Sequence, residues 1–79
     1  MIIKILGVGC SKCKVAEKQV RRAVEMTGRT DIQVLKIESI QEISRYNIMM
    51  TPAVIIDEKV IISGRIPSIK EILLALEKQ

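Results

Sequence analysis

The stretch that decides the fold is residues 2–13, IIKILGVGCSKC, in which an apolar run leads into a pair of cysteines. The first five residues, Ile2–Leu6, are aliphatic except for one lysine, and this pattern favours a β-strand. The glycine-containing tripeptide that follows predicts a loop. Apolar residues then recur three and four positions apart over Ser11–Thr27, which predicts a helix. We therefore expect Cys10 and Cys13 at the junction between a strand and a helix.

Three further apolar runs predict the other strands. They are Asp31–Ile37, Ala53–Ile56 and Val60–Ile62, and a polar tripeptide between the last two predicts a β-hairpin. Both hairpin runs are continuously apolar, which is typical of strands that are covered on both faces. A strand–helix–strand unit joins parallel strands through a right-handed crossover. The sequence therefore predicts a four-stranded mixed sheet with helices on both faces.

Two capping boxes predict where the remaining helices begin. Ser39 and Glu42 form the first box, and Ser68 and Glu71 form the second. In such a box the serine hydroxyl accepts a backbone N–H of the first turn, and the glutamate accepts the N–H of the serine. The first of these helices is expected to be short and to end near Tyr46–Asn47. The order of elements is then β-α-β-α-β-β-α.

The length of 79 residues and the composition exclude several classes of function. We expect residues 1–79 to form one domain, with an aliphatic core supplied by 27 leucine, isoleucine and valine residues. The absence of histidine excludes His-based catalytic triads and His metal sites. Tyr46 is the only aromatic residue, which excludes a stacking platform for single-stranded nucleic acid. No apolar window predicts a membrane span and no signal-peptide pattern is present, so we expect a cytoplasmic protein.

The net charge of +4 is concentrated near the amino terminus. The first 30 residues carry a net charge of +5, and the remaining residues carry −1. A positive patch of this kind steers acidic partners, and a solvated helix face explains the same charges. No recognition-helix pattern and no aromatic residues accompany the charge, so nucleic-acid binding is not expected. The basic residues of this segment are Lys4, Lys12, Lys14, Lys18, Arg21, Arg22 and Arg29.

The motif Cys10-Ser11-Lys12-Cys13 carries the chemistry of the chain. At a helix start the Cys10 sulfur faces unsatisfied N–H groups and the positive end of the helix dipole, about half an elementary charge. Together with Lys12 and Lys14, this is expected to lower the pKa of Cys10 below the free value of about 8.5. Cys13 lies one turn inside the helix, where it is shielded and able to attack a mixed disulfide on Cys10. A bridge over so short a loop stabilises a fold by only about 2 kcal/mol, so redox or metal chemistry is favoured over a structural role.

The pair Thr51-Pro52 directly precedes the predicted strand Ala53–Ile56. Proline is ordinary at the start of a strand, and an X-Pro bond is cis in only about 5–6% of cases. The predicted order of elements nevertheless brings this pair beside the start of the first helix. There the backbone of Thr51 is available to pair with an extended substrate. Met49 and Met50 either fill the core or form a soft apolar rim that accepts varied protein surfaces.

The CxxC motif after the first strand, the Thr-Pro pair before the third and the order of elements together resemble the thioredoxin fold. The chain is most similar to the small thioredoxin/glutaredoxin-like redox-active disulfide proteins of archaea and bacteria, over essentially its whole length. This resemblance implies the strand order 2-1-3-4, a thiol–disulfide oxidoreductase activity on protein disulfides, and no cofactor besides the disulfide itself. It also implies that Cys10 is the nucleophile, that Cys13 resolves the mixed disulfide, and that Pro52 is a cis-proline beside the disulfide.

Several positions depart from the patterns of thioredoxins and glutaredoxins. The pair between the cysteines is Ser11-Lys12 rather than Gly-Pro or Pro-Tyr, which leaves the redox potential open. Gly9 replaces the usual tryptophan, and Lys4 replaces a buried acid of thioredoxins. Lys4 either favours the thiolate or points to solvent. Glutaredoxins hold glutathione partly through two glycines, of which this chain keeps Gly64. It either allows close approach of a ligand or ends a strand in a turn, and the adjacent Arg65 is a candidate partner for a carboxylate.

Three other functions would use the same two thiols. Copper metallochaperones are of similar size, place a CxxC after their first strand, and bind Cu(I) through thiolates. Their order β-α-β-β-α-β ends in a strand, whereas a helix is predicted at the end of this chain. A structural zinc site needs four ligands, and one chain offers two cysteines and no histidine. The third function, a non-enzymatic redox sensor or adaptor, stays open.

The expected partners follow from the oxidoreductase interpretation. We expect protein disulfides as substrates and a flavin-dependent reductase of the thioredoxin reductase type as electron donor, with glutathione as the alternative donor. The protein is expected to act as a monomer, without a bound metal, a nucleic acid or a membrane. The residues expected to contact the substrate are Lys12, Met50, Thr51, Pro52 and Gly64.

Overall fold

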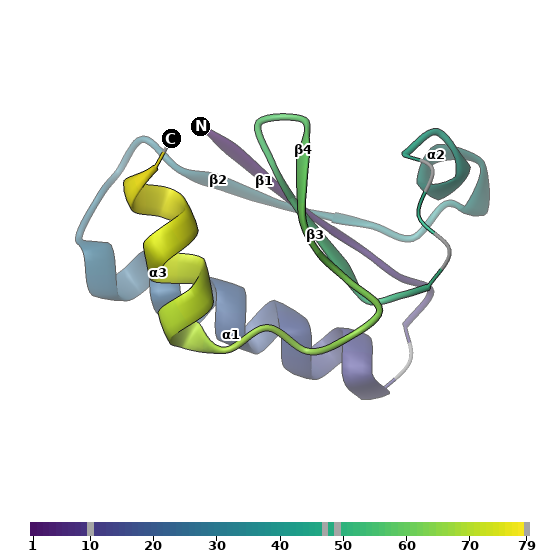
Figure 1. The fold of residues 1–79 in the computed structure, drawn as a ribbon, viewed down its shortest axis with the longest axis horizontal. Coiled ribbons are helices and arrows are strands. Elements are labelled where there is room, and N and C mark those ends of the chain that lie inside the picture. Colours follow the sequence, from purple (N-terminus) through teal and green to yellow (C-terminus); the bar gives the residue numbers. More distant parts are fainter. Residues whose placement is uncertain (10, 47, 49, 79) are drawn as a thin grey trace.

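The helices and strands of the computed structural model follow the order predicted from the sequence (Figure 1). The elements are β1 (Ile2–Leu6), α1 (Ser11–Thr27), β2 (Gln33–Ile37), α2 (Ile40–Ser44), β3 (Ala53–Ile56), β4 (Lys59–Ser63) and α3 (Ile69–Glu77).

The structure describes residues 1–9, 11–46, 48 and 50–78. Two predicted features fall outside the described residues: the nucleophile Cys10 and the contribution of Met49 to an apolar rim. The short helix α2 ends at Ser44 rather than near Tyr46–Asn47 as predicted, because the N–H groups of Arg45 and Tyr46 bond to carbonyls three residues back and form a turn.

The four strands form one mixed sheet in the order β2-β1-β3-β4, which confirms the predicted fold class. β1 and β2 are parallel, and β3 is antiparallel to both β1 and β4. β2 begins at Gln33, opposite Ile2, rather than at Asp31 as predicted. Asp31 lies just before the strand, where its carbonyl accepts a hydrogen bond of 2.9 Å from the amino terminus. The carboxyl end of β1 therefore lies beside those of β2 and the start of β3, where the cysteine motif follows.

The predicted hairpin joins β3 to β4 through a tight turn. Its two central residues, Asp57 and Glu58, have φ values of 46° and 70°. Positive φ at both positions is typical of the primed turns that match the twist of paired strands. A register shift within the hairpin makes Ile61 an extra residue of β4. Ile61 and Ile62 both pack against the core between the sheet and the two long helices as a result.

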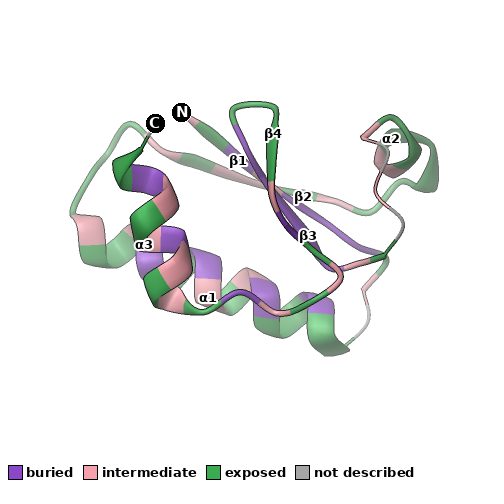
Figure 2. Cartoon of the chain, in the orientation of Figure 1, coloured by how far each residue is buried: buried purple, intermediate pink, exposed green. Residues whose placement is uncertain are grey.

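The main core lies on the face of the sheet that α1 and α3 cover (Figure 1). Figure 2 shows the buried sides of these helices turned toward the strands. The apolar residues that were spaced three and four apart in the sequence supply this side, so their spacing predicted it correctly. The buried members of this core are Ile3, Ile5, Ala16, Val20, Ala23, Val54, Ile56, Ile62, Ile72 and Leu76.

The opposite face of the sheet is covered only in part. Leu6, Ala53 and Ile55 are buried there, beneath side chains from the short α2 segment and its neighbours. Each residue of β3 is buried, so the expectation of two covered faces holds for β3. It is wrong for β4, where Val60 is 45% exposed. The five residues of α2 lie at the far end of the sheet and leave the β4 edge uncovered (Figure 1).

The two predicted capping boxes form to different extents. At α3 the box is complete, because Glu71 N donates to Ser68 Oγ and Ser68 N donates to the Glu71 carboxylate. At α2 the hydroxyl of Ser39 accepts the N–H of Glu42 at 3.5 Å. The second bond of the box, from Ser39 N to the Glu42 carboxylate, is not among the hydrogen bonds of the described residues. The stronger cap therefore belongs to α3, which packs against α1 and closes the main core.

Candidate functional site

The sulfur of Cys13 packs against the end of the first strand. Cys13 lies in the first turn of α1 and is 1% exposed. A Cβ atom placed on Gly7 would lie 2.3 Å from Cys13 Sγ and 3.1 Å from Cys13 Cβ. Only a residue without a side chain allows this approach, so Gly7 is part of the site. The sequence predicts only a loop at Gly7; its place between a strand and a CxxC motif is the signal that could have identified its role.

Thr51 and Pro52, which precede β3, lie near Gly7 and Cys13. A Cβ atom placed on Gly7 would lie 3.8 Å from Thr51 Cβ, so Cys13 and Thr51 border the same small space beside Gly7. Thr51 is half-buried and Pro52 is buried, and the peptide bond between them is cis. The predicted proximity of the Thr-Pro pair to the start of the first helix is therefore observed for the described residues.

Gly64 and Met50 extend this cluster toward the surface. Gly64 N donates a hydrogen bond of 3.0 Å to the carbonyl of Pro52, and Gly64 has a φ of +79°. A Cβ on Gly64 would lie 3.1 Å from Met50 Cβ, so the glycine also leaves room for Met50. Met50 is 64% exposed. The interpretation of Met50 as a core residue is therefore wrong, and its exposed side chain lies beside Gly64.

The approach to α1 contains charged groups of both signs. Lys12 is exposed in the first turn, and no acidic residue lies in that turn. Gly9, with a φ of +79°, directly precedes the cysteine motif. Its Cβ position lies 3.9 Å from Glu38 Oε2, which places an acidic side chain beside the loop. Sequence reasoning missed Glu38, since it follows β2 and gave no motif; only the parallel pairing of β1 and β2 brings it here.

Lys4 lies on the partly covered face of the sheet and has defined partners. Its Nζ donates to Tyr46 Oη at 2.6 Å and to Glu58 Oε1 at 2.8 Å. The hydrogen bond to Glu58, followed by the one to Tyr46, raises the pKa of Lys4 above its usual value. The side chain of Lys4 is 22% exposed, and these two partners were not predicted from the sequence. Its ammonium group ties β1 to the hairpin turn and to the segment behind α2.

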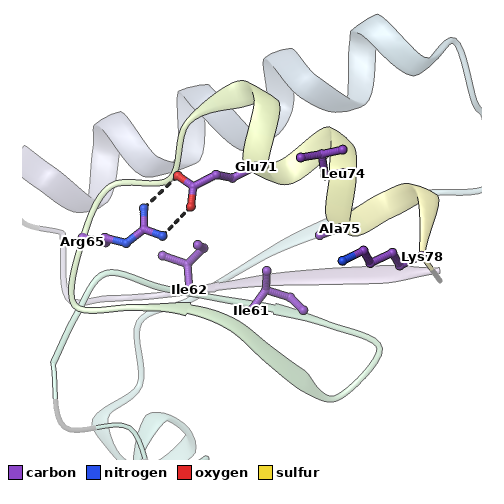
Figure 3. A pocket seen from close by; sticks show the side chains of 7 residues that line it. All are labelled: Ile61, Ile62, Arg65, Glu71, Leu74, Ala75 and Lys78. Carbon is purple, nitrogen blue, oxygen red and sulfur yellow. Dashed lines mark hydrogen bonds and ion pairs between the residues drawn. The ribbon is translucent and has the colours of Figure 1, made fainter.

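Arg65 also has a partner within the chain. Its guanidinium forms a two-pronged ion pair with the carboxylate of Glu71, on the rim of a shallow cavity between β4 and α3 (Figure 3). This cavity has a volume of about 320 Å³. The hydrogen bonds from Arg65 lower the pKa of Glu71 to about 2, with a further contribution from the N–H of Ser68. The carboxylate that Arg65 meets is therefore that of Glu71.

The described residues match neither the pattern of a metal site nor that of a membrane-spanning helix. They contain no group of three or more cysteine, histidine, aspartate or glutamate side chains arranged to hold a metal ion. None of their helices is long and apolar enough to cross a membrane.

Known proteins resemble this chain over nearly its full length. The family model described as a thioredoxin domain matches residues 1–77. The chain belongs to the thioredoxin family. A thioredoxin of Methanocaldococcus jannaschii is 36% identical over 72 residues, which is 91% of this chain and 81% of that protein. A thioredoxin of Methanothermobacter thermautotrophicus is 35% identical over 72 residues, with coverage of 91% and 92%.

Family membership confirms the predicted resemblance and supports a thiol–disulfide oxidoreductase in general terms. The observed order of elements ends in α3, which differs from the strand-ending order of copper metallochaperones. Thioredoxin-family relatives also point to disulfide-containing protein substrates and to a reductase as partner.

Proposed function

We propose that this protein reduces protein disulfides, with Cys10 as the nucleophile and Cys13 as the resolving cysteine. The observation that carries the proposal is the position of Cys13. Its sulfur is shielded in the first turn of α1 and packs against Gly7, with Thr51 bordering the same space. A resolving thiol has to be protected from outside reagents while staying within reach of its neighbour, and this position meets both demands.

The reaction consists of two exchanges at sulfur. The Cys10 thiolate attacks one sulfur of the substrate disulfide; that bond breaks, the other substrate sulfur leaves as a thiolate, and a mixed disulfide forms. The Cys13 sulfur, as thiolate, then attacks the Cys10 sulfur and releases the second substrate sulfur. The substrate gains two electrons and two protons, and the protein is left with a Cys10–Cys13 disulfide. The dithiol is the redox centre, and no further cofactor is required.

Residues around Cys13 are proposed to hold the substrate. The half-buried Thr51 offers its backbone to an extended segment, while Pro52 fixes the start of β3. Met50 supplies an exposed apolar contact that adapts to different sequences. Gly64 keeps the surface beside Met50 open. Lys12 adds positive charge at the start of the helix.

We propose a flavin-dependent reductase of the thioredoxin reductase type as the electron donor, in a reducing compartment such as the cytoplasm. The ion pair of Arg65 with Glu71 supports this choice over glutathione, because the guanidinium that was a candidate for a glutathione carboxylate already has a partner. The donor returns two electrons to the Cys10–Cys13 disulfide and regenerates the dithiol. The protein is proposed to act as a monomer.

A trapping experiment tests the assignment of roles. With Cys13→Ser, reaction with a protein disulfide such as insulin should stop at a covalent adduct through Cys10, visible by mass spectrometry. Cys10→Ser should give no adduct and no insulin reduction with dithiothreitol as donor. An adduct that forms in Cys10→Ser and not in Cys13→Ser would reverse the two roles. Insulin reduction by a variant in which both cysteines are replaced would overturn the proposal.

A further inference from the structure

A row of three cations lies along the outer face of α1. Lys14, Lys18 and Arg22 are spaced four residues apart, and all three are exposed. Side chains at this spacing lie one above the other on a helix, and the row spans about 12 Å at 1.5 Å per residue. Figure 2 shows exposed residues on the side of α1 that is turned away from the sheet. We refer to these three side chains as the cation row.

The cations of the row are weakly compensated within the chain. Among the described residues, Lys14 and Lys18 form no ion pair, and Arg22 has only Glu25 at 3.9 Å. Glu17 lies on the flank of the helix and pairs with Arg21 and Lys36 instead. The row therefore presents unneutralised positive charge to the solvent.

Helix stability does not account for this arrangement. The amino-terminal end of a helix favours acidic side chains, because the helix dipole is positive there. α2 and α3 follow this preference with Glu42 and Glu71 in their first turns, whereas the first turn of α1 contains no acidic residue. Like charges four residues apart also repel each other. Sites that break such local preferences are expected where function requires it.

One end of the cation row lies next to the cysteine motif. Lys14 directly follows Cys13, so the row starts at the cysteine motif and runs away from it along α1. Val15 lies beside the row and is 43% exposed, which adds an apolar contact to the charged face. When the disulfide of a substrate protein reaches the cysteine motif, the substrate surface next to that disulfide would therefore contact α1. Apolar contact with charge around it is the composition of a protein interface.

We propose that the cation row is an electrostatic docking surface for acidic proteins, which it orients with their disulfide toward Cys10 and Cys13. This inference rests on the proposed function and adds the charge class of the partner. The three charges lie within little more than one Debye length at 0.1 M salt, about 10 Å, so they act together on an approaching anion. Their effect falls on the rate of encounter and disappears as salt increases. An acidic protein is favoured over nucleic acid because the outer face of α1 has no aromatic residue among its exposed side chains.

The test uses three synthetic peptides that share one intramolecular disulfide. The disulfide is flanked by three glutamates, three glutamines or three lysines, and the rate constant of reduction by the dithiol protein is measured by stopped flow. At low salt the acidic peptide should react at least about five times faster than the basic peptide, within the range of electrostatic rate effects. At 1 M salt, where the Debye length is about 3 Å, the ratio should approach one.

Charge reversal in the row should remove this preference. Lys18→Glu changes the central cation, and Lys18→Arg should preserve the preference because the charge stays. Lys59→Glu is the matched control, since Lys59 is exposed at the start of β4, at the end of the sheet opposite the cysteine motif. It changes the net charge by the same amount and should keep the acidic preference. Each variant is compared through its own acidic-to-basic ratio, which cancels any general change in reactivity.

The outcomes separate the two proposals. If no peptide is reduced, the proposed function fails. If all peptides are reduced with equal rate constants at low salt, the oxidoreductase stands and the docking surface is refuted. An equal loss of preference in Lys18→Glu and Lys59→Glu would assign the effect to net charge and also refute it. Binding of a fluorescent DNA duplex that requires Lys18, without acidic-peptide preference, would make the row a nucleic-acid site and overturn the inference.

Discussion

Replacing Gly7 with alanine probes the contact on which the candidate site is built. The new Cβ atom would lie 2.3 Å from Cys13 Sγ, closer than the 3.0 Å below which real Cβ contacts essentially do not occur. Rotation of the Cys13 side chain has little room to remove the sulfur overlap, because Cys13 is 1% exposed and closely packed, and Cys13 Cβ would also lie 3.1 Å away. The start of α1 or the end of β1 therefore has to move.

The size of the effect follows from this overlap. Forcing an extra methyl group into a packed site costs about 1–3 kcal/mol. For a domain of this length each kcal/mol lowers the melting temperature by about 4–8 °C, so Gly7→Ala should lower it by about 4–24 °C. The free energy of unfolding is measured by urea denaturation and the melting temperature by circular dichroism, both with the cysteines kept reduced.

Gly28→Ala is the matched control for this substitution. Gly28 has a φ of +68°, and a Cβ there would meet nothing within 4 Å. That variant should lose about 1–2 kcal/mol through backbone strain alone. It should leave insulin reduction intact, whereas Gly7→Ala should slow it at least about tenfold, because a displacement of about 1 Å at reacting groups has effects larger than this.

A double-mutant cycle decides whether Cys13 is the cause. Cys13→Ala removes the sulfur that the new methyl group would meet, so Gly7→Ala should cost clearly less in the Cys13→Ala background than in the wild type. Gly28→Ala should cost the same in both backgrounds, since distant substitutions add within about 0.5 kcal/mol. Equal costs of Gly7→Ala in the two backgrounds would refute the argument that this glycine is required by the cysteine.

Two further predictions follow from burial and charge. At pH 6 to 7, iodoacetamide should modify Cys10 in the reduced protein while the buried Cys13 stays protected. The rate at Cys10 should rise with pH through a pKa below about 8.5. Peptide mass spectrometry measures both rates, and equal rates would contradict the assignment of roles. The pKa of Glu71 is lowered to about 2 by Arg65, so the stability from this pair is complete above the unfolded value of about 4.3 and is lost as the pH falls toward 2. Urea unfolding at several pH values should show this decrease in the wild type and a smaller one in Glu71→Gln; parallel curves would show that the pair does not contribute.

The order of elements could be predicted because each depends on nearby residues. The helical spacing in α1, the capping residue Ser68 and the polar turn at Asp57 each determine structure within a few positions of the chain. The strand order came from the resemblance to a family. Coverage of the sheet could not be predicted in the same way. The run Val60–Ile62 is as apolar as the run of β3, but a short α2 leaves Val60 exposed.

The contacts of the candidate site depend on pairs that are distant in the sequence. Lys4 forms hydrogen bonds with Tyr46 and Glu58, which are 42 and 54 residues away in the sequence, so no local pattern could predict these bonds. The neighbourhood of Gly7 depends on the same long-range pairing, because β3 has to lie beside β1 before Thr51 reaches it. The cysteine spacing and the Thr-Pro pair located the site, and the sheet register determined which residues surround it.

Positive charge near the start of α1 has two separable effects, and the cation row allows them to be distinguished. Charges in the first turn act on a cysteine thiolate, since the dipole and its neighbours matter mainly within one turn. Lys14 is close enough to the cysteine motif to contribute to that effect as well as to docking. Lys18 follows the first residue of α1 by about 10 Å, roughly one Debye length at 0.1 M salt, so its action on the thiolate is largely screened. A partner lying along the helix meets Lys18 and Arg22 directly, which is why reversal at Lys18 tests docking with little change in the chemistry of the cysteines.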